Sequence, residues 1–207
     1  MNGESKSSLT AGILARLRRG WVRDAELGIR GRAVKGLKLI LESGQARIAL
    51  RSCNRVGRGA RVSGRMRVEN YGSIVIGDAF VGRSYFAPVE LLAGPGATIE
   101  VGSGVWINFG SVVAARSRVT IGDRAQLGQY CLVADIDVPE LVAEVDAEEG
   151  RPIVIGADAW LAARVTVRPG VTIGCGTVVA AGSIVETDLP DRVVAGGIPA
   201  RVLRRLA

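Results

Sequence analysis

The chain contains no histidine among its 207 residues. A Ser-His-Asp catalytic triad and a three-histidine zinc site are therefore excluded. Aromatic residues make up only 4% of the chain, whereas 28 glycines and a hydrophobic fraction of 48% are present. This balance is typical of a narrow, repetitive fold with an aliphatic interior rather than of a core built on large rings.

Cysteines are also few, and they are far apart. Cys53, Cys131 and Cys175 form no CxxC pair and are odd in number, so they indicate neither a disulfide framework nor a zinc site. No apolar run approaches the roughly 20 residues that a membrane-spanning helix needs. The N-terminus also lacks the apolar core of a signal peptide. We therefore expect a protein of the reducing cytoplasm that binds no metal.

Charge is distributed unevenly along the chain. Residues 1–67 contain 16 Lys and Arg against 4 Asp and Glu, whereas residues 135–207 contain 7 against 11. We expect residues 1–55 to form a basic N-terminal segment, with a helix near residues 8–21 where apolar residues recur at helical spacing. Such a segment either caps the open end of a repeat domain or contacts an anionic membrane surface, and nucleic acid is the partner that we favour least.

A six-residue period dominates the rest of the chain. Branched aliphatic residues recur at every sixth position, most regularly at Ile155, Leu161, Val167, Ile173, Val179 and Val185. This period fits neither a single amphipathic helix nor a hairpin, and it predicts an all-β solenoid, a parallel β-helix of hexapeptide repeats with about 18 residues per coil. We expect the solenoid over residues 56–190 and a short C-terminal tail or helix over residues 191–207.

Two stretches interrupt the period. Residues 82–97 contain two prolines and are expected to bulge out as a loop. A loop insertion is expected at about residues 135–152, where residues 135–149 hold seven acids and no Lys or Arg. Long loops on a rigid scaffold often carry function, so this insertion is either a functional element or a solvated acidic surface.

The segment from Ile153 to Val185, followed by Gly197-Ile198-Pro199-Ala200 and Arg201, resembles the C-terminal half of hexapeptide-repeat acyltransferases. It is most similar to the maltose, galactoside and capsular-polysaccharide O-acetyltransferases. The resemblance implies a left-handed winding, a homotrimer, and acetyl-CoA or another acyl-CoA as donor. It also implies a sugar-like molecule or polysaccharide precursor as acceptor. The basic N-terminal segment adds a possible peripheral location at the inner face of the membrane to the expected cytoplasmic one. The handedness rests on the resemblance alone, because general crossover rules favour right-handed connections.

The resemblance also assigns residues to a coenzyme A site between subunits. Small residues beside the pantetheine arm and arginines near the nucleotide phosphates are implied at Ala162, Ala163, Ala180, Ala181, Gly182, Ser183, Arg201 and Arg204. The arginines suit this role because guanidinium groups bind phosphate bidentately. On the acceptor side we expect Asn108, Phe109 and Trp160, and Trp160 either walls the acyl site or packs in the trimer.

The histidines that family members usually carry are replaced in this chain. Just before the insertion they fall on Ile136 and Val138, and another falls on Phe109. Asp135 and Asp137 are the candidate surrogate bases. A positioned general base contributes about 10²–10⁴ to the rate, whereas an unperturbed Asp carboxyl, with a pKa of about 3.9, is a weak base.

Three readings of the missing base remain open. The acceptor nucleophile is an amine, which attacks without a base. Alternatively, Asp135 or Asp137 deprotonates a hydroxyl. In the third reading the chain is an inactive relative that binds a ligand or serves as a scaffold.

Overall fold

The computed structural model describes residues 29–136 and 150–206, so the helix expected near residues 8–21 lies outside the described part of the chain. The described residues form a helix, a long series of short strands and a C-terminal hairpin. The bounds are α2 (Ile29–Ala49), β1 (Arg55–Val56), β2 (Arg61–Asn70), β3 (Ser73–Ile76), β4 (Val81–Ala93), β5 (Thr98–Val101), β6 (Trp106–Asn108), β7 (Val112–Ala115), β8 (Arg118–Ile121), β9 (Gln126–Leu127), β10 (Leu132–Ala134), β11 (Ile153–Ile155), β12 (Trp160–Leu161), β13 (Thr166–Val167), β14 (Thr172–Ile173), β15 (Val178–Val179), β16 (Ile184–Val185), β17 (Val193–Gly197) and β18 (Ala200–Arg205).

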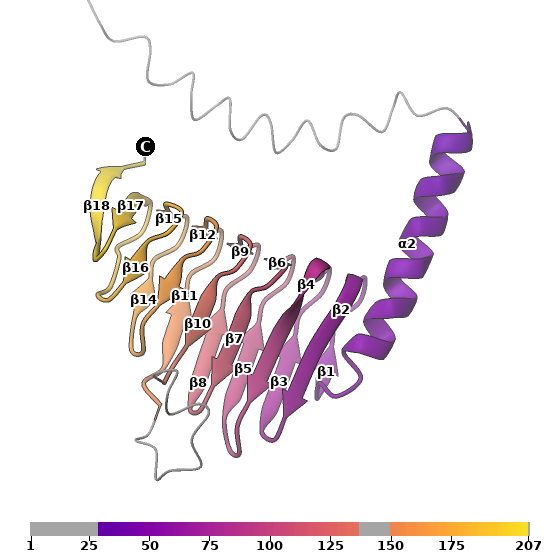
Figure 1. Ribbon diagram of the computed structural model, residues 1–207, viewed down its shortest axis with the longest axis horizontal. Helices are drawn as coiled ribbons and strands as arrows, with labels where there is room; N and C mark the ends of the chain where they lie inside the picture. The colour runs from indigo at the N-terminus through magenta and orange to yellow at the C-terminus, as the bar shows by residue number, and fades with distance from the viewer. Residues whose placement is uncertain (1–28, 137–149, 207) are drawn as a thin grey trace, which may run out of the picture. The chain divides into compact units, whose positions relative to one another are not determined.

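The strands wind into a parallel solenoid with three faces (Figure 1). One face is a six-stranded sheet in the order β1-β3-β5-β8-β11-β14. The other two faces share β4, which pairs through its first residues with β6 and through its last residues with β7. From β4, one face continues through β6, β9, β12, β15 and β17, and the other through β7, β10, β13 and β16.

The hexapeptide period sets the register between coils. Ile155 pairs with Ile173, 18 residues later, and Val101 pairs with Ile121, 20 residues later, as the spacing predicts. The inward aliphatic side chains stack into one core in which Ile107, for example, has no exposed surface. The predicted solenoid of hexapeptide repeats is therefore confirmed.

The bulging loop expected at residues 82–97 is wrong. This stretch forms most of β4, which runs parallel to β2 over nine residue pairs. The pairing of β2 with β4 is regular apart from one register shift. On one side of the shift Gly64 pairs with Ser84, and on the other side Met66 pairs with Val89. Pro88 lies in this shift, where its missing N–H removes no bond from the ladder. Pairing with β2 thus overrides the local signal of the prolines.

The short C-terminal helix is also wrong, because residues 200–205 form the strand β18. β18 runs antiparallel to β17, and the chain reverses at Gly197, whose φ of 110° is readily available only to glycine. An unpaired edge strand is a liability in a soluble protein. β18 covers the exposed edge of β17 at the end of this face. Residues 200–205 thereby gain backbone hydrogen bonds to β17, which a separate helix would not make.

The C-terminal part of α2 caps the first coils, which confirms the expected helical cap. Ala46 and Leu50 pack into the solenoid core. Glu42 is buried, and its Oε1 accepts hydrogen bonds from the Ser63 hydroxyl at 2.8 Å and from Nη1 of Arg83 at 2.7 Å. A buried carboxylate needs such partners, because an unpaired charge in the interior is costly.

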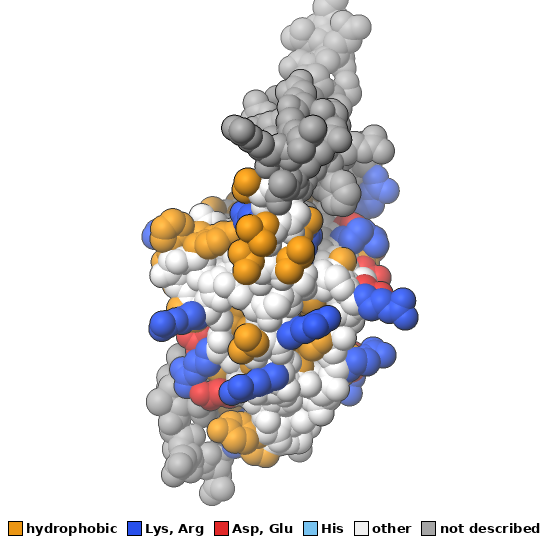
Figure 2. Space-filling model, turned by 90° about the vertical axis from the view of Figure 1, so that its right-hand side faces the viewer, with side chains coloured by type: hydrophobic (Ala, Val, Ile, Leu, Met, Phe, Trp, Pro, Cys, Tyr) orange, Lys and Arg blue, Asp and Glu red, His pale blue; other side chains and the backbone are white. Residues whose placement is uncertain are grey.

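The chain divides into two compact units, residues 1–41 and 42–207. At the end of the second unit where the first coils lie, Lys and Arg side chains outnumber Asp and Glu (Figure 2). Within the described residues, no helix is long and apolar enough to cross a membrane.

Candidate functional site: a groove along one corner of the solenoid

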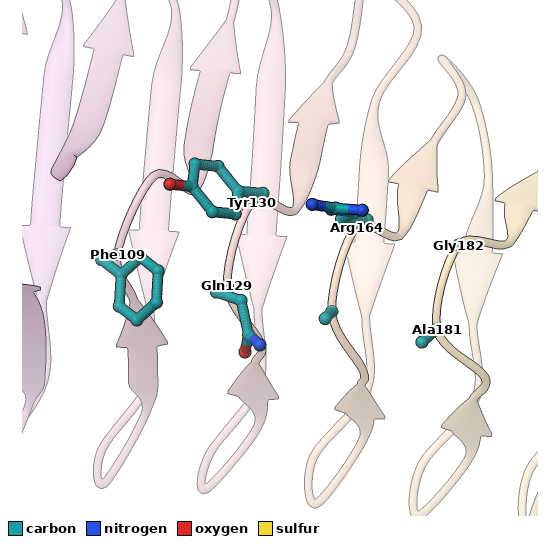
Figure 3. Close-up of a pocket in the computed structure, with 7 residues that line it drawn as sticks. Phe109, Gln129, Tyr130, Arg164, Ala181 and Gly182 are labelled. Carbon is teal, nitrogen blue, oxygen red and sulfur yellow. The ribbon is translucent and has the colours of Figure 1, made fainter. Parts of the chain in front are cut away.

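Four successive coils turn at the same corner, and their turns enclose a groove of about 470 Å³ (Figure 3). The turns follow strands β6, β9, β12 and β15. The residues that line the groove are Phe109, Gln129, Tyr130, Ala163, Arg164, Ala181 and Gly182. This volume lies within the range of about 300–1,000 Å³ that is usual for small-molecule sites.

Backbone hydrogen bonds hold the four turns in line. Each turn donates one N–H to the carbonyl of the turn before it: Tyr130 to Phe109 at 3.0 Å, Arg164 to Gln129 at 2.8 Å and Gly182 to Ala163 at 2.8 Å. The residue at the tip has positive φ in every turn, including the non-glycine residues Tyr130 (57°) and Arg164 (59°). The coil geometry therefore imposes a conformation that most residues avoid, and it aligns the tip side chains in one row.

Side-chain size divides the groove into two ends. Phe86, Phe109 and Tyr130 form an edge-to-face aromatic row, with centroid distances of 5.2 Å and 5.5 Å. In Figure 3 the rings of Phe109 and Tyr130 stand at one end of the groove, and Ala181 and Gly182 lie at the other. One end thus has an aromatic wall, and the other leaves the backbone accessible to a ligand.

Gly110 makes room for the aromatic wall. A Cβ at this position would overlap the ring of Tyr130, so the ring lies directly over the glycine of the preceding turn. We predict that Gly110→Ala displaces the Tyr130 ring, weakens ligand binding in the groove at least tenfold, and lowers the free energy of unfolding by about 2 kcal/mol. Urea denaturation and titration calorimetry with coenzyme A measure the two effects.

Gly96→Ala is the matched control for this prediction. Gly96 has nearly the same φ as Gly110 (73° against 69°), but a Cβ there would meet no atom within 4 Å. It should therefore show the backbone cost alone, about 1 kcal/mol, with unchanged ligand binding. Equal effects of the two substitutions would mean that the Tyr130 ring does not depend on the space above Gly110.

The groove unites four of the residues that the sequence assigns to the site. Phe109, from the expected acceptor side, lies in one groove with Ala163, Ala181 and Gly182, from the expected coenzyme A side. Sequence reasoning missed three further lining residues, Gln129, Tyr130 and Arg164. Their only sequence signal is their place in the later coils, where Gln129 matches Phe109 in the hexapeptide and Tyr130 and Arg164 match Gly110.

Other expected cofactor residues lie beside the groove rather than in its lining. Ala162 and Ala180 are half-buried and donate their N–H groups to the next coil. Ser183 is buried, and its hydroxyl donates to the Ala180 carbonyl at 2.7 Å and accepts from the Gly197 N–H at 3.2 Å. Ser183 thus joins the last coil to the C-terminal hairpin.

Arg201 and Arg204 lie exposed on β18. The Nη1 of Arg201 donates to the carbonyl of Ala200 at 2.8 Å. Both arginines are therefore presented by a hairpin rather than by the helix expected from the sequence.

The expected acceptor residues Asn108 and Trp160 lie on the strands that lead into the turns. The side-chain oxygen of Asn108 accepts the N–H of Phe109 at 3.0 Å and so shapes the first turn. Trp160 points outward from β12 with 39% of its surface exposed, and through Gln126 it lies in register with Trp106, which is 43% exposed. Neither Asn108 nor Trp160 lines the groove itself.

The structure places Asp135 in the interior, with no exposed surface. One carboxylate oxygen accepts the N–H of Arg116, and the other accepts those of Ser117 and Arg118, all at 2.7 Å. Its backbone carbonyl accepts the N–H of Arg151 at 2.8 Å. Asp135 therefore ties the two ends of the insertion to the coil before it, and both carboxylate oxygens are engaged in that task.

The remaining base candidate, Asp137, lies outside the described residues, as does Val138. Ile136, at one of the family's histidine positions, is only 4% exposed. Among the groove-lining residues of the described chain there is no carboxylate. The polar groups there are the amide of Gln129, the phenol of Tyr130 and the guanidinium of Arg164.

A thiol nucleophile does not replace the missing base in this groove. Cys131 follows Tyr130, but burial raises the pKa of its thiol to about 11, and its Sγ lies 3.1 Å from the carbonyl of Ala162. The reactive form is the thiolate, so Cys131 is a packing residue. The described residues also contain no group of three or more His, Cys, Asp or Glu side chains that could hold a metal ion.

Comparison with known proteins finds similarity to proteins that are named acetyltransferases. The chain is 33% identical over 132 residues to galactoside O-acetyltransferase of Escherichia coli K12, covering 62% of this chain and 64% of that protein. The chain thus spans slightly less than two thirds of that curated relative. No family model matches the chain.

Solved structures agree with this relationship. A hexapeptide-repeat-containing acetyltransferase from Vibrio cholerae, crystallised with acetyl coenzyme A, is 26% identical, with a TM-score of 0.58 over 80% of this chain and 78% of its own. An N-acyltransferase from Bacillus cereus, in complex with dTDP and coenzyme A, has the same fold at 17% identity, with a TM-score of 0.64 over 80% and 90% of the two chains. In fold, repeat and sequence this chain is similar to the hexapeptide-repeat acetyltransferases.

Proposed function

We propose that this protein is a homotrimeric acyltransferase that moves an acyl group, most simply acetyl, from acyl-CoA to an amine of a sugar-like acceptor. The groove at the corner of the solenoid carries the proposal. It joins small residues suited to a thioester arm to an aromatic wall, in a chain related to acetyltransferases. The Vibrio cholerae relative crystallised with acetyl coenzyme A supports the choice of donor.

The shape of the groove suits a long, narrow ligand. Ala163, Ala181 and Gly182 expose backbone along successive coils, so that the amide groups of a pantetheine arm can approach it closely. The aromatic wall at Phe109 and Tyr130 then lies where the arm ends, and it shields the thioester carbon from water. A neighbouring subunit in a trimer would close the open side of this groove.

Exposed aromatic side chains support the trimer. Trp106, Trp160 and Phe86 are 43%, 39% and 83% exposed on the solenoid. Clustered exposed apolar surface usually marks an interface. Multi-angle light scattering should give three times the mass of the 21.7 kDa chain, and a monomer at micromolar concentration would refute a site shared between subunits.

The amine acceptor follows from the groups that the groove lacks. An alcohol must lose its proton as it attacks the thioester, so it depends on a general base. This chain has no histidine, the described residues that line the groove include no carboxylate, and the carboxylate of Asp135 is engaged by three backbone N–H groups. A neutral amine attacks directly and releases its proton afterwards. The B. cereus N-acyltransferase has the same fold, and this supports the proposal of an amine acceptor.

The proposed reaction is balanced without a further reactant. The amine nitrogen forms a bond to the thioester carbonyl carbon, and the carbon–sulfur bond then breaks. The thiolate of coenzyme A leaves and is protonated, and the proton lost by the nitrogen goes to water. The Gln129 amide and the Tyr130 phenol are the neutral hydrogen-bond donors among the described lining residues, and we propose that the Gln129 amide donates to the carbonyl oxygen as negative charge develops there.

A panel of acceptors tests this function. Amino sugars, matched sugars with hydroxyl groups, and sugar nucleotides carrying an amine are incubated with acetyl-CoA, and released coenzyme A is measured. We expect turnover only with amine acceptors. Turnover with hydroxyl acceptors alone would overturn the amine proposal, and the absence of turnover with both classes would favour the inactive ligand-binding or scaffolding role.

Arg201 and Arg204 are proposed to bind the phosphates of coenzyme A. We predict that replacing both with alanine weakens coenzyme A binding roughly tenfold or more, because each charge-assisted hydrogen bond contributes about 1.5–3 kcal/mol. Pantetheine, which has no phosphates, should bind both proteins equally. Isothermal titration calorimetry checks this prediction, and equal weakening for the two ligands would place these arginines away from the phosphates.

A further inference from the structure

Arg164 is the one charged side chain among the described residues that line the groove. It is exposed, and none of the ion pairs in the described part of the chain includes it. The other polar side chains of the lining, Gln129 and Tyr130, contribute an amide and a phenol. The described lining therefore presents a positive charge without a counter-charge of its own, which favours an anionic group on a ligand.

Arg124 shows what neutralises an arginine at the same point of a coil. Like Arg164 it stands at the tip of a turn, with a φ of 56° against 59°, but at the corner that follows β8. The tip of the next coil at that corner is Asp158, whose carboxylate accepts Nε of Arg124 at 2.8 Å and Nη2 at 2.6 Å. At the corner of the groove, the tip of the coil after Arg164 is Gly182. The carboxylate that neutralises Arg124 thus has no counterpart in the turn that follows Arg164.

Gly182 leaves open space beside Arg164. A Cβ at Gly182 would meet no atom within 4 Å, and Figure 3 shows Arg164 between the ring of Tyr130 and Gly182 along the row of turns. Neighbouring coils lie about 4.8 Å apart, and the side chain of Arg124 spans this spacing to reach Asp158. A ligand's anionic oxygens can therefore take the place beside Arg164 that a carboxylate takes beside Arg124.

We infer that the acceptor of this protein carries a phosphate or carboxylate group, which Arg164 binds while the acceptor amine faces the thioester. A guanidinium binds either group through two parallel N–H···O bonds. The inference rests on the proposed function, and it narrows the sugar-like acceptor to an anionic amino sugar. Arg164 then determines which acceptors the groove accepts.

The acceptor is a better source of this anionic group than the donor. With the thioester at the aromatic wall, the coenzyme A phosphates lie at the far end of the pantetheine arm. That arm is much longer than the single coil spacing of about 4.8 Å that separates the turns of Tyr130 and Arg164. The acetyl group itself carries no charge. A dicarboxylic acyl group would bring a carboxylate to the groove, and the experiment separates this source from the acceptor.

Steady-state kinetics with matched amine acceptors tests the inference. Glucosamine is compared with glucosamine 1-phosphate, glucosamine 6-phosphate and glucosaminuronic acid, each with acetyl-CoA. We expect kcat/KM for at least one anionic acceptor to exceed that for glucosamine roughly tenfold to a hundredfold, the usual contribution of a hydrogen bond to a charged group. The preference should shrink as NaCl rises from about 0.1 M to about 0.5 M, because salt screens exposed charges.

Arg164→Gln should bring kcat/KM for the anionic acceptor down to the value for glucosamine. Most of this change should appear in KM, because the lost interaction binds the substrate and the transition state equally. Arg164→Lys should keep part of the preference, since it retains the charge but not the planar fork. Arg124→Gln is the matched control, and it should leave the preference unchanged, because it removes an arginine from the same point of a coil at another corner. Circular dichroism verifies that every variant is folded.

Titration calorimetry separates failure of the inference from failure of the proposed function. The same four sugars are titrated into the protein with coenzyme A present, so that no turnover is needed. Tighter binding of an anionic sugar that is lost in Arg164→Gln, without acylation of any amine, would refute the acyl transfer and leave the anion site standing. Absence of both acylation and preferential binding would refute the two together.

Three kinetic results would overturn the inference while the proposed transfer to amines stands. The first is acylation of glucosamine and the anionic sugars at equal efficiency, and the second is a preference that survives Arg164→Gln. The third is turnover of glucosamine with succinyl-CoA that exceeds turnover with acetyl-CoA and is lost in Arg164→Gln. That result would assign Arg164 to a carboxylate of the acyl group.

Discussion

Replacing Asp135 with alanine should lower the free energy of unfolding by about 3 kcal/mol or more. Three N–H groups, those of Arg116, Ser117 and Arg118, lose their acceptor, and each buried donor left unpaired costs about 1–3 kcal/mol. The ends of the insertion also lose the residue that ties them to the preceding coil. Urea denaturation monitored by circular dichroism measures this effect.

Asp188→Ala is the control for Asp135→Ala. Asp188 also accepts a backbone N–H, that of Thr172 at 2.7 Å, but it is exposed and makes a single such bond. Its removal should cost about 1 kcal/mol or less, because water replaces the lost acceptor.

Asp135→Asn separates the structural role from a catalytic one. If Asp135 is structural, turnover per folded molecule should stay within about threefold of the wild type. A stable Asn variant whose turnover falls a hundredfold, the effect expected for loss of a general base, would restore Asp135 as the base.

Asp137→Asn should have little effect on amine acylation, whereas loss of a true general base would cut turnover about 10²–10⁴-fold. The expected change is less than about threefold, because a neutral amine needs no base. The rate should also rise with pH until the acceptor amine is deprotonated. Steady-state kinetics from pH 5 to pH 9 with one amino sugar measures both quantities.

A hydroxyl acceptor gives the opposing result. If Asp137 deprotonates a hydroxyl, Asp137→Asn should abolish turnover on that acceptor and leave coenzyme A affinity nearly unchanged. Robust turnover on a hydroxyl that survives both Asp135→Asn and Asp137→Asn would defeat the amine and carboxylate proposals together. The base would then belong to the acceptor or to a neighbouring subunit.

Periodicity alone predicted most of the solenoid. Each coil repeats an inward aliphatic residue at every sixth position, so the pairing of Ile155 with Ile173 and of Val101 with Ile121 follows from counting along the chain. Repeats of this kind bury their side chains mainly on the neighbouring coils, which makes local pattern and global register agree. The missing histidines, likewise, required only the sequence.

Local signals failed where a distant strand supplied the hydrogen bonds. The prolines of residues 82–97 indicated a loop, but pairing with β2 made β4 continuous apart from one register shift. The C-terminal residues read as a helix, yet β17 offered an unpaired edge that β18 covers. In both cases the strand that supplies the hydrogen bonds lies outside the segment itself. The secondary-structure propensity of the segment's own residues therefore does not predict the pairing.

The candidate site was only partly visible in the sequence. The resemblance pointed to Phe109, Ala163, Ala181 and Gly182. Tyr130 lines the groove because its turn stacks on the turn of the preceding coil, which the sequence did not reveal. The sequence by itself determined the repeat, the basic N-terminal region and the absence of histidine. Tertiary structure alone decided that Asp135 is an anchor, because its three N–H partners lie 17 to 19 residues earlier and meet it only when the coils stack.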